Sequence, residues 1–281
     1  MKAQILLAVH NPRPDLFNRQ LESLRHQTVT DWQCLILDDA SAEPRLIEAA
    51  LLDPRFVLTR TASNLGPYRA FETLLAAADE VPVFFCDQDD YWHPEKLQRL
   101  LDVSGSAFCA MRVVDDQQAV VRERFLPAPT SLSPCGLLLM NCVSGTSLKI
   151  TPEVRSAALP FPAPTLRGWH DQWLAAVAAR IGGLTYVDEA LVDYTQHAQQ
   201  VIGDGLRRLD SRRLRAFLRS PELRSRADWV RTAAYRLLLL PGPVDDHLQA
   251  LAAGDFAAVL RRYEVPRQRS LLLLLGSRGL G

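Results

Sequence analysis

The sequence predicts an α/β fold in which helices cover both faces of a largely parallel, doubly wound sheet. Short apolar segments, typical of buried strands, alternate with segments of helical periodicity four times in about ninety residues. This alternation favours right-handed βαβ units. Clusters of polar side chains follow three of the expected strands, and ligands of such sheets bind at the carboxyl ends of the strands. We therefore expect these three polar loops to share one crevice.

Each element of the first half has its own signal. The apolar run at 3–9 predicts a strand that ends at His10-Asn11-Pro12. Apolar residues at positions 16, 17, 21 and 24 have the spacing of an amphipathic helix. The expected elements are strands at 3–9, 32–37, 56–59 and 83–86, helices at 16–26, 45–52 and 69–78, and a turn at 64–67.

The second half is less regular. The expected elements are a strand pair at 107–114 and 118–121, loops at the proline-rich stretches 127–134 and 160–164, a hydrophobic segment over 136–150, a helix over 171–181, and extended segments at 184–187 and 191–194. Ser144-Gly145-Thr146 interrupts the hydrophobic segment, and Gly182-Gly183 ends the helix.

Charge divides the chain into two parts. Residues 206–281 carry 15 basic against 7 acidic side chains, although the formal charge of the whole chain is zero. We expect a main domain over 1–205 and a basic, Arg/Leu-rich helical extension over 206–281. The extension either makes peripheral contact with an anionic membrane or packs as a helical cap on the main domain. No base-stacking pattern accompanies its charge, so nucleic acid is not an expected partner.

Cysteine usage and hydropathy bear on the compartment. The five cysteines are an odd number and form no Cys-x-x-Cys pattern, which favours free thiols in a reducing cytoplasm. The N-terminus has only about six apolar residues before a polar turn, and no run approaches the ~20 residues of a spanning helix. We expect a cytoplasmic protein, with contact at the inner face of the cell membrane as the alternative.

The stretch VFFCDQDDYWHPEKL at 83–97 places Asp87, Asp89 and Asp90 at the end of an apparently buried strand. Carboxylates crowded there repel one another unless a positive charge lies between them. An Asp-x-Asp pattern offers oxygen ligands that suit Mg²⁺ or Mn²⁺, ions that are typically shared with substrate phosphates. The alternative is a solvated acidic turn that caps the helix expected near Pro94.

Seven motifs together resemble the family-2 glycosyltransferases of GT-A fold, and among them the rhamnosyltransferase-like branch. These motifs are HNP, LDDAS, NLG, FFCDQDDYWHPEKL, NCVSGTSLKI, GWHDQWLAAVAARIGGLTYVDEALVDY and YTQHAQQVIG. Their order and spacing match over roughly residues 3–204. The resemblance implies a GT-A nucleotide-diphospho-sugar transferase fold, a Rossmann-like mixed sheet flanked by helices, with its catalytic domain over 1–205.

The resemblance also implies a donor site for a nucleotide-sugar. Asp87 and Asp89 would hold the divalent metal, with His197 near the metal or the diphosphate. Asp38 and Asp39 would lie beside the nucleoside. The residues implied in nucleotide-sugar binding are His10, Asn11, Asp38, Asp39, Arg69, Gln88 and His197. Taken alone, Asp38-Asp39-Ala40-Ser41 is also a helix-capping signal, and a lone histidine in a loop is often incidental.

Asp171 occupies the place of the family's catalytic base. An inverting transfer needs a carboxylate that takes the proton of the acceptor hydroxyl while its oxygen attacks the anomeric carbon. The acceptor side would also include Trp169, His170 and Gly145, whose missing side chain permits close backbone approach. Asp171 is equally suited to be a capping or first-turn residue of the helix over 171–181.

The expected function is therefore inverting, metal-dependent transfer of a sugar to a hydroxyl of a cell-surface glycan or lipid-linked glycan. The resemblance favours TDP-rhamnose as donor, and UDP-linked hexoses stay open because uracil and thymine offer the same N3–H. Two alternatives are a sugar nucleotidyltransferase and a non-catalytic nucleotide- or glycan-binding relative. The first would need a glycine-rich phosphate loop after the first strand, where this chain has His10-Asn11-Pro12-Arg13-Pro14.

Overall fold

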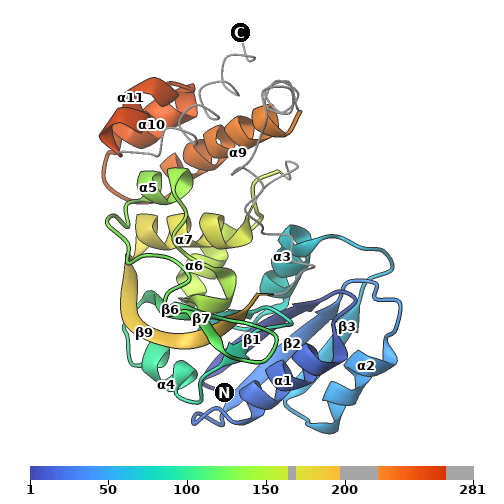
Figure 1. Ribbon diagram of the computed structural model, residues 1–281. Helices are drawn as coiled ribbons and strands as arrows, with labels where there is room; N and C mark the ends of the chain where they lie inside the picture. Colours follow the sequence, from blue (N-terminus) through green and yellow to red (C-terminus); the bar gives the residue numbers. More distant parts are fainter. Residues whose placement is uncertain (164–168, 197–220, 264–281) are drawn as a thin grey trace, which may run out of the picture.

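A nine-stranded mixed sheet forms the centre of the computed structural model, which describes residues 1–163, 169–196 and 221–263 (Figure 1). The strands are β1 (Ala3–Val9), β2 (Trp32–Asp38), β3 (Phe56–Arg60), β4 (Val83–Cys86), β5 (Tyr91–Trp92), β6 (Ser106–Val114), β7 (Val120–Arg122), β8 (Leu148–Ile150) and β9 (Leu184–Thr195). Their order is β3-β2-β1-β4-β8-β6-β9-β5, and β7 pairs with β6. Strands β1 to β4 are parallel, whereas β8 is antiparallel to both neighbours.

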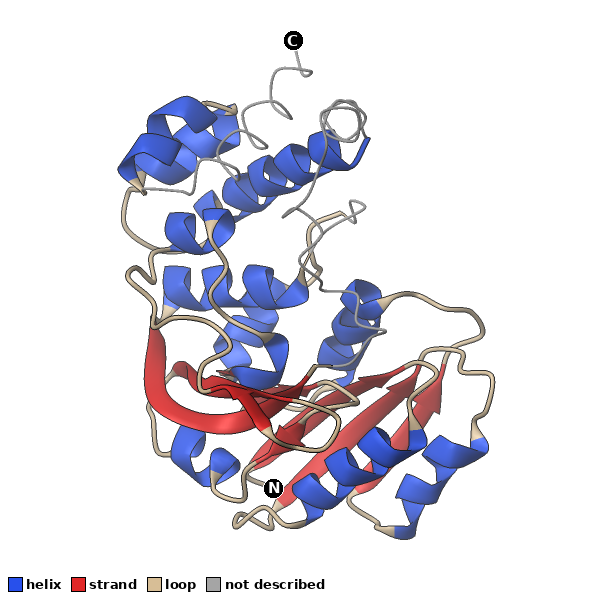
Figure 2. Ribbon diagram, viewed as in Figure 1, coloured by secondary structure: helices blue, strands red, loops and turns tan. Residues whose placement is uncertain are grey.

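Helices cover both faces of this sheet, as Figure 2 shows. They are α1 (Pro14–Arg25), α2 (Arg45–Glu48), α3 (Pro67–Ala77), α4 (Lys96–Leu101), α5 (Pro134–Leu139), α6 (Pro152–Ala158), α7 (His170–Ile181), α9 (Pro221–Leu238), α10 (Asp246–Ala253) and α11 (Phe256–Arg262). The 3₁₀ turns η1 (Ala49–Leu52) and η2 (Gly145–Ser147) complete the set.

The first half of the chain follows the sequence prediction closely. Strand β1 is buried along almost its whole length, and it pairs in parallel with β2 on one side and β4 on the other. Helix α1 begins at Pro14, where the fixed φ of proline suits the first helical position. The helix expected over 45–52 is a single α-helical turn, α2, continued by the 3₁₀ turn η1.

Helices α5 and α6 were not expected from the sequence. All residues of α5 after Pro134 are buried, so its sequence lacks the polar face that reveals a helix. Capping side chains start both helices: Ser133 Oγ accepts from the Gly136 N–H, and Thr151 Oγ1 accepts from the Val154 N–H. The extended segments at 184–187 and 191–194 form one strand, β9, whose pairing with β6 shifts register around Ala110.

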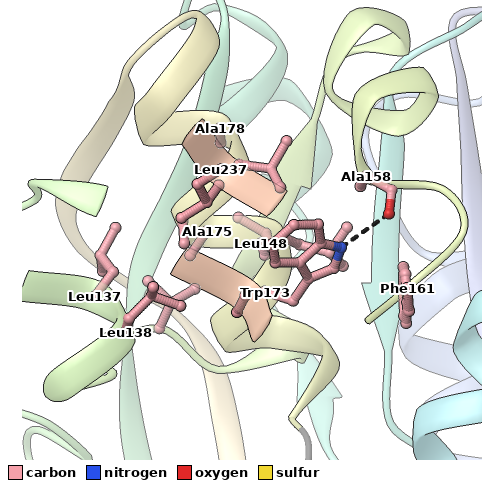
Figure 3. Close-up of a cluster of buried hydrophobic side chains, with 14 of the residues drawn as sticks. Leu137, Leu138, Leu148, Ala158, Phe161, Trp173, Ala175, Ala178 and Leu237 are labelled. Atoms are coloured by element: carbon pink, nitrogen blue, oxygen red, sulfur yellow. Dashed lines mark hydrogen bonds between the residues drawn. The ribbon is translucent and has the colours of Figure 1, made fainter. Parts of the chain in front are cut away.

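The hydrophobic core lies in two clusters on opposite faces of the sheet. Leu6 belongs to one cluster, whereas Ile5 and Leu7 belong to the other, because successive side chains of a strand point to opposite faces. Figure 3 shows the cluster around Trp173, whose indole N–H donates to the Ala158 carbonyl oxygen at 2.9 Å. Trp173 is therefore a core residue.

The described part of the C-terminal extension packs on α5 and α7. Trp229, Val230 and Leu237 of α9 are fully buried in the same cluster as Trp173. Arg180 of α7 donates hydrogen bonds to the carbonyl oxygens of Leu237, Leu240 and Pro243, which fixes the end of α9. Residues 221–263 thus form a helical cap. Within the described ranges, no helix is both long and apolar enough to cross a bilayer.

Candidate functional site

An acidic loop follows β4, where the parallel strands present their carboxyl ends. Asp87 and Asp89 are partly exposed, while Asp90 is fully buried. Burial and the charges of Asp89 and Asp171 raise the pKa of Asp87 to about 7, and the nearby Lys96 acts in the opposite direction. Helix α4 begins only at Lys96, and no side chain caps it. The acidic loop therefore makes no capping hydrogen bond to this helix, and its effect on the helix dipole stays an open alternative.

Lys96 is a buried cation behind the acidic loop. Its Nζ donates to the Thr146 carbonyl oxygen at 2.6 Å and lies 2.9 Å from the centroid of the Trp92 ring. Burial lowers the pKa of Lys96 to about 7, although the charges of Asp90 and Asp87 act against this shift. Trp92 is fully buried and donates through Nε1 to Thr146 Oγ1, so it cannot stack on a sugar.

Asp90 adds a second buried carboxyl to this region. Neither of its oxygens has a hydrogen-bond partner of good geometry within the described residues, although Thr146 and the Thr195 main chain lie close enough to favour its charged form. Burial and the neighbouring charges of Asp89 and Asp87 raise the pKa of Asp90 well above its usual range. The charged form of Asp90 is therefore disfavoured beside Asp87 and Asp89.

The loops after β1, β2 and β4 meet through His10. Its main-chain N–H donates to Gln88 Oε1 at 2.8 Å, and the Gln88 amide donates back to the His10 carbonyl oxygen at 3.3 Å. His10 Nδ1 lies 2.7 Å from the Asp39 carbonyl oxygen. Asn11 has a left-handed φ of 45°, and its Oδ1 accepts from the Ala42 N–H. The loops after β1, β2 and β4 are therefore in direct contact at the strand ends.

Asp38 and Asp39 are both buried and both engaged by their own chain. Asp38 accepts from the Ser41 N–H and pairs with Arg60 at 3.2 Å. Asp39 Oδ1 accepts from Thr61 Oγ1 and the Leu65 N–H, and Oδ2 accepts from the Gly66 N–H. These contacts close a turn and anchor the Asn64-Leu65-Gly66 loop rather than cap α2, which begins only at Arg45.

Asp171 lies in the first turn of α7 and is partly exposed. The Gln172 N–H donates to Asp171 Oδ1 at 2.6 Å. Burial raises the pKa of Asp171 to about 6, while hydrogen bonds from Asn141 and the Gly145 main chain, together with the charge of Arg226, act in the opposite direction. The charge of Asp171 also contributes to the raised pKa of Asp87, so the two carboxylates lie close enough to interact. Both readings of Asp171, first-turn residue and base, are compatible with this geometry.

The turn η2 connects the acidic loop with Asp171. Thr146 receives hydrogen bonds from Lys96 and Trp92 on one side, and Gly145 lies against His170 and Asp171 on the other. A Cβ on Gly145 would lie 2.5 Å from His170 Nε2, so only glycine fits there. His170 is buried and stacks on Phe71, with ring centroids 4.1 Å apart, and burial lowers its pKa to about 3.

The acidic loop has the chemistry of a divalent-cation site. Burial and the charges of Asp89 and Asp171 raise the pKa of Asp87, and a bound cation would oppose both effects. In the part of the chain that the structure describes, no three His, Cys, Asp or Glu side chains converge as a ligand set. Asp87 and Asp89 are the residues that would hold such an ion, with water and phosphate oxygens completing the shell, as is usual for Mg²⁺.

Of three other site residues predicted from the sequence, the structure describes two, Arg69 and Trp169. Arg69 lies in the first turn of α3 and pairs with Glu72. Trp169 is the partly exposed N-cap residue of α7, beside Asp171. His197 lies outside the described residues.

Several residues contact the site although the sequence alone did not assign them to it. Lys96 stands within the recognised motif, but its burial depends on how β5 and α4 fold back onto η2. Arg19 of α1 donates to the Asp89 carbonyl oxygen at 3.3 Å and to Thr195 Oγ1. Asn141 and Arg226 reach Asp171 from distant segments. Such contacts have no local signal, since they depend on tertiary packing alone.

The chain is similar to known glycosyltransferases. Residues 5–121 match the family model described as glycosyl transferase family 2. An uncharacterised glycosyltransferase of Nostoc sp. is 25% identical over 70% of this chain and 65% of its own length. The putative teichuronic acid biosynthesis glycosyltransferase TuaG of Bacillus subtilis is 24% identical over 68% of this chain and 77% of its own length.

Solved structures share the fold. Residues 1–349 of S. aureus TarS in complex with UDP superpose with a TM-score of 0.64 and 18% identity, covering 95% of this chain and 73% of that one. The mannosyltransferase PcManGT from Pyrobaculum calidifontis, in complex with GDP-Man and Mn²⁺, gives a TM-score of 0.53 and 16% identity, covering 99% and 86%. The expected mixed α/β sheet of GT-A type is confirmed, and the rhamnosyltransferase-like branch stays a prediction.

Proposed function

We propose that the protein is an inverting, metal-dependent glycosyltransferase, because residues 5–121 match the family model of glycosyl transferase family 2. It transfers a sugar from a nucleoside diphosphate to a hydroxyl of a cell-surface glycan or lipid-linked glycan. TDP-rhamnose is the donor that the motifs favour, and a UDP-linked hexose is the alternative. The observation that supports this most is that the turn η2 contacts both regions: Thr146 accepts from Trp92 and Lys96, which follow the acidic loop, and the Gly145 main chain contacts Asp171.

Asp171 acts as the general base. It takes the proton of the acceptor hydroxyl as that oxygen bonds to the anomeric carbon, and the bond from this carbon to the diphosphate oxygen breaks on the opposite side. The electron pair of the broken bond leaves with the nucleoside diphosphate. A base with a pKa of about 6 is ionised at neutral pH and still accepts a proton readily.

Asp87 and Asp89 hold the cation. When bound, a divalent metal supplies the positive charge that stabilises the departing diphosphate. The chain's own part is to keep both carboxylates at the mouth of β4, with Lys96 and Arg19 fixing the loop from behind. TarS is solved with UDP-GlcNAc and PcManGT with GDP-Man and Mn²⁺, which supports a nucleotide-sugar donor and a divalent ion here.

The loops around His10 and Asp39 bind the nucleoside. Gln88 acts indirectly, because its amide is engaged with the His10 main chain and so joins the base pocket to the acidic loop. We assign the chemistry to residues 1–205. The basic extension, residues 206–281, would also be the part that makes peripheral contact with the inner face of the cell membrane.

A donor screen tests this proposal. TDP- and UDP-sugars are incubated with the purified protein and Mn²⁺ or Mg²⁺, and release of the nucleoside diphosphate is measured. We expect slow hydrolysis of one donor class, abolished by excess chelator and by Asp171→Asn. Turnover that persists in chelator would contradict the metal assignment. Binding of a sugar nucleotide with no hydrolysis and no transfer would instead identify a non-catalytic relative.

A further inference from the structure

The C-terminal extension reaches the candidate base through one side chain. Arg226 lies in the second turn of α9, and its Nη2 donates to Gln172 Oε1 at 2.7 Å. Gln172 directly follows Asp171, and its main-chain N–H donates to the Asp171 carboxylate. Arg226 of the extension is therefore linked to the Asp171 carboxylate through a single residue, Gln172.

Gln172 is fully buried and fully engaged. Its Nε2 donates to the carbonyl oxygens of Leu137 and Leu138 at the end of α5, at 2.9 and 2.7 Å. Its Oε1 is left to accept from Arg226. The side chain therefore joins helices α5, α7 and α9 at the turn that carries Asp171.

The position of Arg226 is set by α9 itself. Trp229, one turn further, is fully buried, and its indole N–H donates to Tyr68 Oη at 3.3 Å. The Arg226 guanidinium lies 5.1 Å from the Trp229 ring centroid, within the range of a cation–π contact. At the other end, Arg180 binds the last carbonyl oxygens of α9. Helix α9 is thus held at Trp229 in its middle and at its C-terminal end, which presents Arg226 at a defined place.

We propose that Arg226 is a positioning residue for Asp171, so that the helical extension completes the catalytic site of the main domain. Through Gln172 it fixes the first turn of α7, and its charge stabilises a carboxylate that the acidic loop otherwise repels. The favourable effect of Arg226 on the charged form of Asp171 agrees with this arrangement. The inference rests on the proposed glycosyltransferase function.

Arg226→Gln, Arg226→Lys and Arg231→Gln in the full chain test the proposal. Arg231 is the matched control, because it lies on the same helix but pairs with Asp228, away from Gln172. The rate of the chemical step is measured as kcat for hydrolysis of the sugar nucleotide that the donor screen identifies. Binding is read as the Kd for UDP or TDP with Mn²⁺ by calorimetry, which a change at the base leaves untouched.

We expect Arg226→Gln to lower kcat by about tenfold to a hundredfold, the range for a displaced catalytic group. Its nucleotide Kd should stay within about twofold, as should both parameters of Arg231→Gln. Arg226→Lys keeps the charge and should recover most of the turnover. Wild-type turnover in Arg226→Gln, or an equal loss in Arg231→Gln, would overturn the inference. Absence of hydrolysis in the wild type would overturn the proposed function instead.

A double variant tests the route through Gln172. If Arg226 acts through this side chain, Arg226→Gln combined with Gln172→Leu should be no slower than Gln172→Leu alone. Additive losses in kcat would contradict this route and leave only the direct action of the Arg226 charge on Asp171.

Discussion

Lys96 Nζ donates to the carbonyl oxygen of Thr146 at 2.6 Å, and both residues are fully buried. This hydrogen bond joins the start of α4, just behind the acidic loop, to the turn that contacts Asp171. This contact therefore links the acidic loop, which would bind the metal, to Asp171, which would remove the proton.

Replacement of Lys96 by methionine should lower both stability and turnover. The variant leaves the Thr146 carbonyl oxygen without its partner, which costs about 1–3 kcal/mol, and it releases η2 from the acidic loop. Lys149→Met is the matched control, because Lys149 is also buried and donates to two carbonyl oxygens, those of Leu100 and Val103. Thermal unfolding should show a loss in both variants, and kcat should fall only in Lys96→Met. An equal fall in kcat would show that Lys96 has no special link to the site.

Asp87→Asn should stabilise the metal-free protein and abolish turnover. The pKa of Asp87 is raised to about 7 in the folded chain, against about 3.9 in an unfolded one. A raised carboxyl pKa means that the folded state binds the proton more tightly. The stability that this proton contributes is present below pH ~4 and is lost as the pH rises towards about 7.

The measurement is the melting temperature of both proteins in chelator between pH 4.5 and 8. The variant should melt higher than the wild type at neutral pH, by roughly 2–4 °C per kcal/mol of relieved repulsion, and the gap should shrink as the pH falls. Added Mn²⁺ should raise the melting temperature of the wild type more than that of Asp87→Asn. A gap that is constant with pH would mean that Asp87 does not titrate in this range.

Turnover should depend on the ionisation of Asp171. Its pKa is raised to about 6, mainly by burial, and a base acts only when it is deprotonated. We expect kcat to fall about tenfold per pH unit below this value and to level off above about pH 7. Asp171→Asn should lose nearly all turnover while keeping the affinity for UDP or TDP with Mn²⁺. Retained turnover in this variant would remove the base assignment.

Gly145→Ala should damage the site although it adds only one methyl group. The new Cβ would lie 2.5 Å from His170 Nε2, and the ring cannot move freely because it stacks on Phe71. Overpacking of this kind costs about 1–3 kcal/mol and shifts the first turn of α7. Gly182→Ala is the control, since nothing lies within 4 Å of its Cβ and its φ of −140° suits any residue. Comparable kcat values for the two variants would show that η2 tolerates the shift.

The sequence was sufficient for the parts of the fold with strong periodicity. Strand β1, helix α1 and the parallel pairing of β1 to β4 have clear apolar patterns and short connections. Helix α5 is apolar all round, and strand β5 has only two residues, so neither has a period that a sequence reveals.

The site divides in the same way. Polar residues at the ends of β1, β2 and β4 could be predicted because parallel strands end on one edge. The sequence gives no sign that Asp38 is paired with Arg60, or that Gln88 is engaged with a main chain. Lys96 and Arg226 act across long sequence separations, and only the packed structure brings them to the acidic loop and to Asp171.

Asp39 bears on how readily donor preference could change in evolution. Three acceptor positions of its carboxylate are already taken by Thr61, Leu65 and Gly66, and a carboxylate offers about four. A nucleobase can therefore gain only one hydrogen bond from it, and a single hydrogen bond to a charged group contributes about 1.5–3 kcal/mol. Few substitutions around this loop would suffice to exchange one nucleotide for another, while the machinery that breaks the sugar–phosphate bond is left intact.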